Sequence, residues 1–256
     1  MNIVVPMKFV PDLVEDLEID AGTGLLDRSF LRLMPNELDD HALEEALLLK
    51  ERHGGRVTVL TPDTGDVDET LFTAIAKGAD RVIKLTGEGF DQGPSSQRIA
   101  AAYRQAVGDI YFDLILTGTQ AVDDLDGFVG ALLAEQFRLP YVGYVTKVAA
   151  SGGEWVVQKE YPGGLNAEIV VSGPAVLGIQ AAEKPPRYVV TSKVMEAMKT
   201  ATIEEIAVGG ATGDNEVTVS AMSLPESGSH AEMIEGNAQQ VAEKLVQLLR
   251  ERGIVA

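Results

Sequence analysis

Residues Phe112 to Gly130 read FDLILTGTQAVDDLDGFVG. The apolar run at 114–116 is typical of a buried strand, which Thr117 and Gly118 end. A polar, acidic loop follows, and a helix is predicted to begin near Gly127. The first N–H groups of a helix have no partners inside it and attract a phosphate. Most strand-to-helix loops bind nothing, so this stretch alone predicts the fold more firmly than a ligand.

The first 140 residues alternate between strand and helix patterns. Strands are predicted at 3–5, 56–61, 81–85 and 113–117, and helices at 37–53, 67–77, 96–108 and 128–137. This order predicts an α/β fold with a doubly wound, mainly parallel sheet, whose ligands bind at the carboxyl ends of its strands. Asn36 is predicted to cap the helix that follows it, with Asp39 at the third helical position in a variant of the capping box.

The pattern changes after Pro140. Antiparallel additions to the sheet are predicted at 142–149, 155–160 and 167–171, and a further strand at 175–180. From Lys184 the sequence is irregular, with a short helical run near 192–198 and a Gly/Ser-rich passage over 209–229. A last amphipathic helix is predicted after Asn237, and its apolar stripe is Val241, Leu245, Leu248 and Leu249. We therefore divide the chain into an α/β domain, 1–183, and a C-terminal arm, 184–256.

Composition excludes several classes of protein. The 256 residues carry a net charge of −18, which argues against nucleic acid or an anionic membrane as a partner, because both are bound through Lys and Arg. The chain has no cysteine and three scattered histidines, so disulfides, thiolate metal sites and a histidine-based metal site are not expected. No apolar run approaches the roughly 20 residues that cross a bilayer, and a signal-peptide pattern is missing. We expect a soluble, cytoplasmic protein without membrane insertion.

Catalytic motifs are also missing. The sequence contains no GxGxxG after a strand, no GxxxxGK[ST] and no GxSxG. Asp123, Asp124 and Asp126 lack the spacing of a calcium-binding loop, and we expect their side chains to hold the loop or cap the next helix. With no catalytic constellation, the chain is expected to bind a ligand or a partner rather than to act as an enzyme on its own.

Short motifs recur along the chain in a characteristic order. They are KFVPD at 8–12, NELDD at 36–40, KGADR at 77–81, GTQAVDD at 118–124, EYPGG at 160–164, GPAV at 173–176 and PRY at 186–188. Together they resemble the β subunit of the electron transfer flavoproteins over nearly the whole chain. MIEG at 233–236 resembles the branch of that family that serves methylamine-type dehydrogenases.

The resemblance implies a Rossmann-like fold of the adenine nucleotide alpha hydrolase-like type, and a subunit that forms a heterodimer with an α subunit. In such heterodimers one FAD, held mainly by the α subunit, carries electrons from a dehydrogenase to an acceptor, while the β subunit buries AMP and its C-terminal arm wraps the α subunit. Leu13 and Leu38 are implied to shape one side of the flavin site. The residues implied to bind AMP are Pro6, Asn36, Glu37, Leu38, Asp39, Pro62, Gly118, Thr119, Gln120, Ala121, Val122, Asp123, Asp124, Leu125, Asp126, Gly127, Phe128 and Val129. Pro6 departs from the small apolar residue usual there, and Pro62 has no N–H to donate, so both are van der Waals candidates.

Two alternatives remain open. In electron-bifurcating members of the family a second FAD replaces AMP, and their loop reads roughly DGDTAQVGP, where positions 123–131 here read DDLDGFVGA. Asp124 stands in place of a glycine and Phe128 in place of a glutamine, and both would repel or crowd a longer diphosphate. The other alternative is a free-standing adenine-nucleotide-binding protein, for which the long irregular segment 184–229 would have no use.

The loop near Thr191 is implied to dock a flavin-linked dehydrogenase. Thr191 stands where relatives that serve such enzymes have an exposed leucine, and only Lys193 and Lys199 follow it. Buried apolar anchors dominate protein interfaces, so the missing leucine predicts that the dehydrogenase is not a standard fatty acyl-CoA one.

Overall fold

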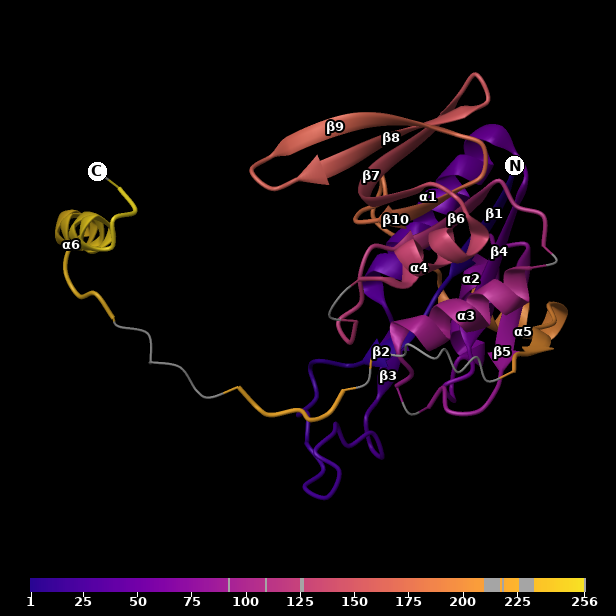
Figure 1. Cartoon of the computed structure of the whole chain (residues 1–256), viewed down its shortest axis with the longest axis horizontal. Helices are drawn as coiled ribbons and strands as arrows, with labels where there is room; N and C mark the ends of the chain where they lie inside the picture. The colour runs from indigo at the N-terminus through magenta and orange to yellow at the C-terminus, as the bar shows by residue number, and fades with distance from the viewer. Residues whose placement is uncertain are drawn as a thin grey trace. The chain divides into compact units, whose positions relative to one another are not determined.

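The computed structural model describes residues 1–91, 93–108, 110–124, 127–209, 217, 219–225 and 233–255. The chain forms two compact units, Met1–Ala221 and Met222–Ala256. The first unit is built on one large sheet with helices on both of its faces (Figure 1). This unit extends past the boundary predicted between residues 183 and 184. That the residues after this boundary contact partner proteins stays a prediction.

Within the described residues the large sheet has nine strands, in the order β11-β5-β4-β1-β6-β10-β7-β8-β9. They are β1 (Asn2–Pro6), β4 (Arg56–Pro62), β5 (Arg81–Thr86), β6 (Leu114–Gly118), β7 (Tyr141–Ser151), β8 (Glu154–Tyr161), β9 (Leu165–Ser172), β10 (Ala175–Ile179) and β11 (Glu204–Ala207). Neighbours from β11 to β7 run parallel, whereas β7, β8 and β9 are antiparallel. The predicted Rossmann-like, doubly wound α/β sheet with antiparallel additions is confirmed.

Four helices cover the parallel strands. They are α1 (Glu37–His53), α2 (Asp68–Lys77), α3 (Ser96–Val107) and α4 (Val129–Phe137), and their predicted bounds agree to within one residue. Successive side chains of a strand point to opposite faces, so Ile3 and Val5 of β1 pack in one cluster with Leu43 of α1. Val4 packs on the other face with Tyr103 of α3. Both faces of the parallel strands are therefore buried, as their continuous apolar sequences require.

Three short strands were not predicted. β2 (Phe9–Pro11) and β3 (Leu33–Pro35) form a separate antiparallel pair, and β11 joins the large sheet by pairing parallel with β5. β11 lies in the region that was expected to be irregular after Lys184, whereas α5 (Thr191–Thr200) confirms the short helical run predicted near 192–198. The Gly/Ser-rich passage over 209–229 lies largely outside the described residues.

The second unit holds α6 (Ala238–Glu251), whose predicted start after Asn237 is confirmed. The Asn237 side chain accepts hydrogen bonds from the N–H groups of Gln239 and Gln240, and the Gln240 side chain accepts one from the Asn237 N–H. This capping box fixes the helix start. None of the residues of α6 is buried, so its apolar stripe is not packed within the second unit. Among these residues no helix is long and apolar enough to cross a membrane.

Candidate nucleotide site

The chain order of the strands creates a crevice between β1 and β6. From β1 the chain passes to β4 and β5 on one side, and then returns to β6 and β10 on the other. In such sheets ligands bind outside the carboxyl ends of the strands at this point of reversal. A cavity opens there, lined by Pro6, Lys8, Asn36, Asp39, Tyr103, Thr117, Gly118, Thr119, Gln120, Ala121, Asp124 and Val129. Its space of about 20 Å³ fits one water-sized group, so a whole nucleotide would extend beyond it or displace the loop after β6.

Asp39 ties the two sides of the crevice together. Its Oδ2 accepts the Lys8 N–H at 2.9 Å and its Oδ1 accepts the Gly118 N–H at 2.8 Å, so one carboxylate joins the ends of β1 and β6. Burial raises the pKa of Asp39 from 3.8 to about 6, against the opposing effect of the two N–H groups and Lys8. Gly118 is required here, because a Cβ at that position would lie 2.6 Å from Asp39 Oδ1.

The predicted capping box at the start of α1 is wrong in its side chains. Asn36 does occupy the N-cap position, but its side chain accepts no hydrogen bond from the helix. Its Nδ2 instead donates to the Gln120 carbonyl at 3.0 Å, which fastens the loop after β6 to α1. Asp39 makes the two contacts across the crevice in place of a bond to the Asn36 N–H. The cap residues are therefore used for tertiary contacts.

The acidic residues of the loop hold it in place, as expected for Asp123 and Asp124. Asp124 Oδ1 accepts the Ser96 hydroxyl at 2.8 Å and the Gly127 N–H at 3.1 Å. Asp123 Oδ1 lies 2.6 Å from Lys8 Nζ. The N-cap of α4 is Phe128, and no side chain among the described residues caps this helix. Asp126, like Leu125, lies outside the described residues.

The start of α4 and the end of β6 leave polar groups available beside the cavity. No side chain among the described residues caps the first turn of α4, and Val129 at its start lines the cavity. The Thr117 hydroxyl also lines it, is buried, and has no hydrogen-bond partner within the described residues. A Cβ at Gly130 would approach Thr117 Oγ1 to 2.8 Å, so glycine allows the helix to begin against this hydroxyl. Uncapped helix N–H groups beside a free hydroxyl suit a phosphate.

Thr119 is held by hydrogen bonds to two other strands, β10 and β7. Its N–H donates to the Ile179 carbonyl at 3.0 Å, and its Oγ1 accepts the Tyr144 N–H at 3.0 Å. Tyr144 adopts φ 59°, a left-handed conformation that is rare for a residue with a Cβ. Such strained residues persist only where their surroundings hold them. The Thr119 hydroxyl thus has a partner, whereas that of Thr117 has none among the described residues.

The other residues expected at the site lie around its rim. Pro62 lines a small adjoining cavity together with Lys8 and Asp123. Leu38 lies against the Gly118 backbone, and Gly127 adopts φ 63° where a Cβ would lie 2.9 Å from the Thr119 carbonyl. Three are exposed to solvent, namely Glu37, Val122 and Phe128.

Sequence analysis missed three residues that line the cavity. Lys8, Tyr103 and Thr117 were not among the expected binding residues. Thr117 ends a predicted strand and Lys8 comes three residues after one, and such positions can be recognised in a sequence. Tyr103 comes from α3, where its spacing indicates only a core position, and its hydroxyl donates to the Met7 carbonyl at 2.6 Å.

Comparison with known proteins identifies the family. The family model of the electron transfer flavoprotein domain matches residues 25–210. The chain belongs to the electron transfer flavoprotein family. It is 31% identical over 264 residues to the electron transfer flavoprotein subunit beta of Thermoanaerobacterium thermosaccharolyticum, with 100% of both chains covered.

Two further β subunits of this family match as closely. Identity is 32% over 261 residues with electron transfer flavoprotein subunit beta of Clostridium acetobutylicum, and 30% over 263 residues with that of Methylophilus methylotrophus. Each match covers 98% of both chains. The resemblance to electron transfer flavoprotein β subunits is therefore confirmed.

Proposed function

We propose that the chain pairs with an α subunit to carry electrons from a dehydrogenase to an acceptor through FAD, and that it binds AMP in the crevice between β1 and β6. The observation that carries the nucleotide proposal is the buried Thr117 hydroxyl beside the start of α4, because neither has a side-chain partner among the described residues. A buried hydroxyl without a partner costs about 1–3 kcal/mol, and a phosphate oxygen would relieve that cost.

The charges around the crevice favour one phosphate over two. Lys8 is the one basic side chain among the described lining residues, and it already pairs with Asp123. Asp124, in the loop after β6, is only 5% exposed. A diphosphate that continued along this loop would bring a second negative group toward both carboxylates without a free cation to offset it. AMP therefore fits the crevice better than a second FAD.

In this proposal the chain itself performs no reaction. FAD, held mainly by the α subunit, supplies the electron-transfer chemistry. The residues of this chain bind and orient: Asp39 holds the two strand ends together, Asn36 fastens the loop, and Thr117 with the start of α4 receives the phosphate. Leu13, which is 59% exposed, is proposed to lie beside the flavin together with Leu38.

The two proposed protein partners correspond to two exposed regions. The apolar stripe of α6, which includes Leu245, is not packed within the second unit, and we assign it to the α subunit. Around Thr191, Tyr188 before α5 and Met195 within α5 are exposed. We assign this segment to the flavin-linked dehydrogenase. Exposed apolar groups of this kind mark interaction surfaces.

The test is to co-express the chain with an α-like electron transfer flavoprotein subunit, release the bound ligands with acid, and quantify AMP and FAD per heterodimer. One AMP and one FAD are expected. Two FAD and no AMP would replace the proposal by the bifurcating type. A chain that forms no complex and carries no flavin would instead be a free-standing nucleotide-binding protein.

A further inference from the structure

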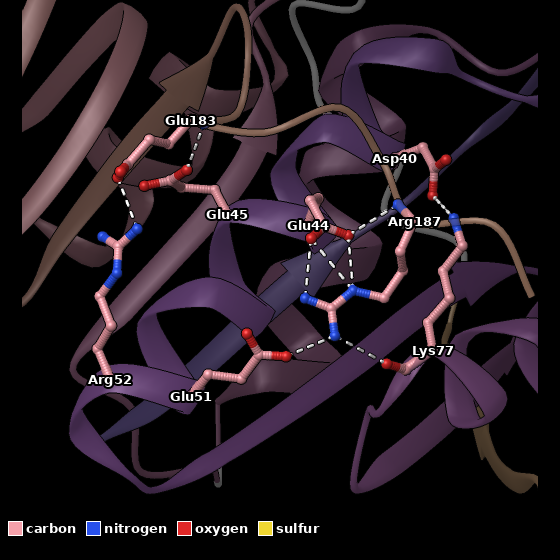
Figure 2. A network of polar contacts seen from close by, with 8 residues as sticks. All are labelled: Asp40, Glu44, Glu45, Glu51, Arg52, Lys77, Glu183 and Arg187. Carbon is pink, nitrogen blue, oxygen red and sulfur yellow. Dashed lines mark hydrogen bonds and ion pairs between the residues drawn. The ribbon is translucent and has the colours of Figure 1, made fainter.

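The connection between β10 and α5 crosses the outer surface of α1. We call residues 180–187 the strap. Its backbone is held largely by side chains of α1 (Figure 2). The Ala182 N–H donates to His41 Nδ1 at 3.1 Å, and the Glu183 N–H donates to Glu45 Oε2 at 2.9 Å. The Arg187 N–H donates to Glu44 Oε2 at 3.0 Å. One helix therefore receives three N–H groups of the strap.

Arg187 ends the strap in a clamp formed with Glu44 and Glu51. Its Nε and NH2 groups donate to the two Glu44 oxygens at 2.9 and 2.8 Å, and its NH1 lies 2.6 Å from Glu51 Oε1. NH1 also reaches the carbonyl of Lys77, the last residue of α2, at 3.5 Å. Arg187 thus contacts α1 and α2 together, and Figure 2 shows its guanidinium between them.

The clamp is stronger than the other ion pairs of the strap. Glu44 is 3% exposed, and although burial raises its pKa, the hydrogen bonds from Arg187 outweigh that effect and lower it. Arg187 supplies a planar fork that binds both carboxylate oxygens, which a lysine cannot do. The pair of Arg52 with Glu183, by contrast, has both side chains about one third exposed, and such pairs contribute little.

We infer that Arg187 is a positioning residue, which fixes the strap on α1 and α2 and thereby sets the orientation in which α5 is presented. Three residues separate Arg187 from α5, and beyond them α5 is buried only at Val194 and Ala197. Next to this buried stripe, α5 exposes Met195 and Met198. The inference rests on the proposed function only for the identity of the partner that α5 contacts. Its test requires no partner.

Loss of the guanidinium would leave Glu44 as a buried charge without its partner, which is strongly unfavourable. Water can reach Glu44 if the strap lifts from α1. Lifting would free the residues before α5 and allow the helix to take several orientations on α2. The expected consequence is a wider range of α5 positions in a chain that is otherwise folded.

The chain contains no cysteine, so two introduced cysteines can carry spin labels at chosen positions. We select Ser192→Cys at the start of α5 and Glu135→Cys in α4, both exposed positions. The distance distribution between the labels, measured by pulsed electron spin resonance on the full chain, is expected to be narrow. Adding Arg187→Gln should at least double its width, whereas Arg52→Gln, the same substitution in an exposed pair to the same strap, should leave it unchanged.

An Arg187→Gln distribution as narrow as that of Arg52→Gln would overturn the inference, even if the variant melted at a lower temperature. If circular dichroism shows that Arg187→Gln is unfolded, Glu51→Ala takes its place. The Glu51 side chain is 56% exposed, so this variant retains the fold while it removes one arm of the clamp. It should widen the distribution partly, and an unchanged width would again overturn the inference. None of these results depends on AMP or FAD binding.

Discussion

Asp39 accepts two amide N–H groups across the crevice while it is almost fully buried. Its pKa is raised to about 6 in the folded chain, against 3.8 without burial. The folded state therefore binds a proton more readily than the unfolded state between these pH values. Stability falls with rising pH wherever the folded state binds more protons, so this carboxyl favours the folded state below about pH 4 and loses that contribution as the pH rises to about 6.

The matching prediction compares the chain with Asp39→Asn, which cannot ionise. A gap of about two pH units corresponds to about 3 kcal/mol. From pH 4 to pH 7 the free energy of unfolding of the chain should fall by about that amount relative to the variant, as measured by urea unfolding at both pH values. A difference between the two proteins that does not change with pH would show that Asp39 is not the titrating group.

Thr117 and Thr119 form a matched pair for testing the phosphate proposal. Thr117→Val removes a hydroxyl without a described partner, so stability should be retained while AMP binding to the heterodimer weakens by about tenfold, the loss of one hydrogen bond. Thr119→Val leaves the Tyr144 N–H without its acceptor and should lower stability by about 1–2 kcal/mol. Calorimetric titration with AMP and thermal melting measure the two effects. Equal AMP affinity in the chain and in Thr117→Val would remove Thr117 from the site.

At the scale of elements, α4 ends in an unfavourable conformation. Its C-cap, Arg138, adopts φ 56° and ψ 46°, and it is exposed. Glycine takes this left-handed conformation without the steric cost of a Cβ. Arg138→Gly should therefore raise the free energy of unfolding by about 1 kcal/mol. The control, Glu135→Gly within the same helix, should lower it by about 1 kcal/mol, and urea unfolding measures both. The prediction fails if both glycines destabilise the chain.

Local patterns predicted the long elements and missed what depends on distant partners. The helix over 37–53 follows from its spacing of apolar residues, and its bounds agree with α1. β11 reads EEIA, which carries no strand pattern, and it forms a strand because β5 offers an open edge and Arg81 pairs with Glu204. The capping box failed for a similar reason, because the sequence does not show that Lys8 and Gly118 lie within reach of Asp39.

The sequence likewise predicted one part of the candidate site and missed another. The loop after β6 and the residues around Asn36 could be placed at one end of the sheet, because parallel strands bring their carboxyl ends together. The free hydroxyl of Thr117 could not be found from the sequence, since most buried threonines have partners that depend on the packing of other elements. The clamp at Arg187 joins residues that lie 143 and 136 positions apart, and no local pattern indicates such a contact.

At the scale of the whole molecule, the first unit holds all of the described core. Both hydrophobic clusters lie within Met1–Ala221, and none of the described residues from Met222 onward is buried. A chain shortened to residues 1–221 should therefore unfold with a free energy within about 0.5 kcal/mol of the full chain, as expected for changes far from buried contacts. Urea unfolding of the two chains measures the difference. A loss of several kcal/mol would show that the second unit contributes to the core.

The pairing of β11 with β5 has a consequence for synthesis on the ribosome. Arg81 and its partner Glu204 are 123 residues apart, so at about 5–20 residues per second β11 emerges roughly 6 to 25 s after β5. During that interval β5 is an open sheet edge, which invites pairing with other nascent chains. Arg81 places positive charge on that edge from the start, and charge discourages such pairing. When the late strand arrives, Glu204 neutralises Arg81 and Glu205 joins the existing pair of Lys84 with Asp68, so the protection ends as the sheet is completed.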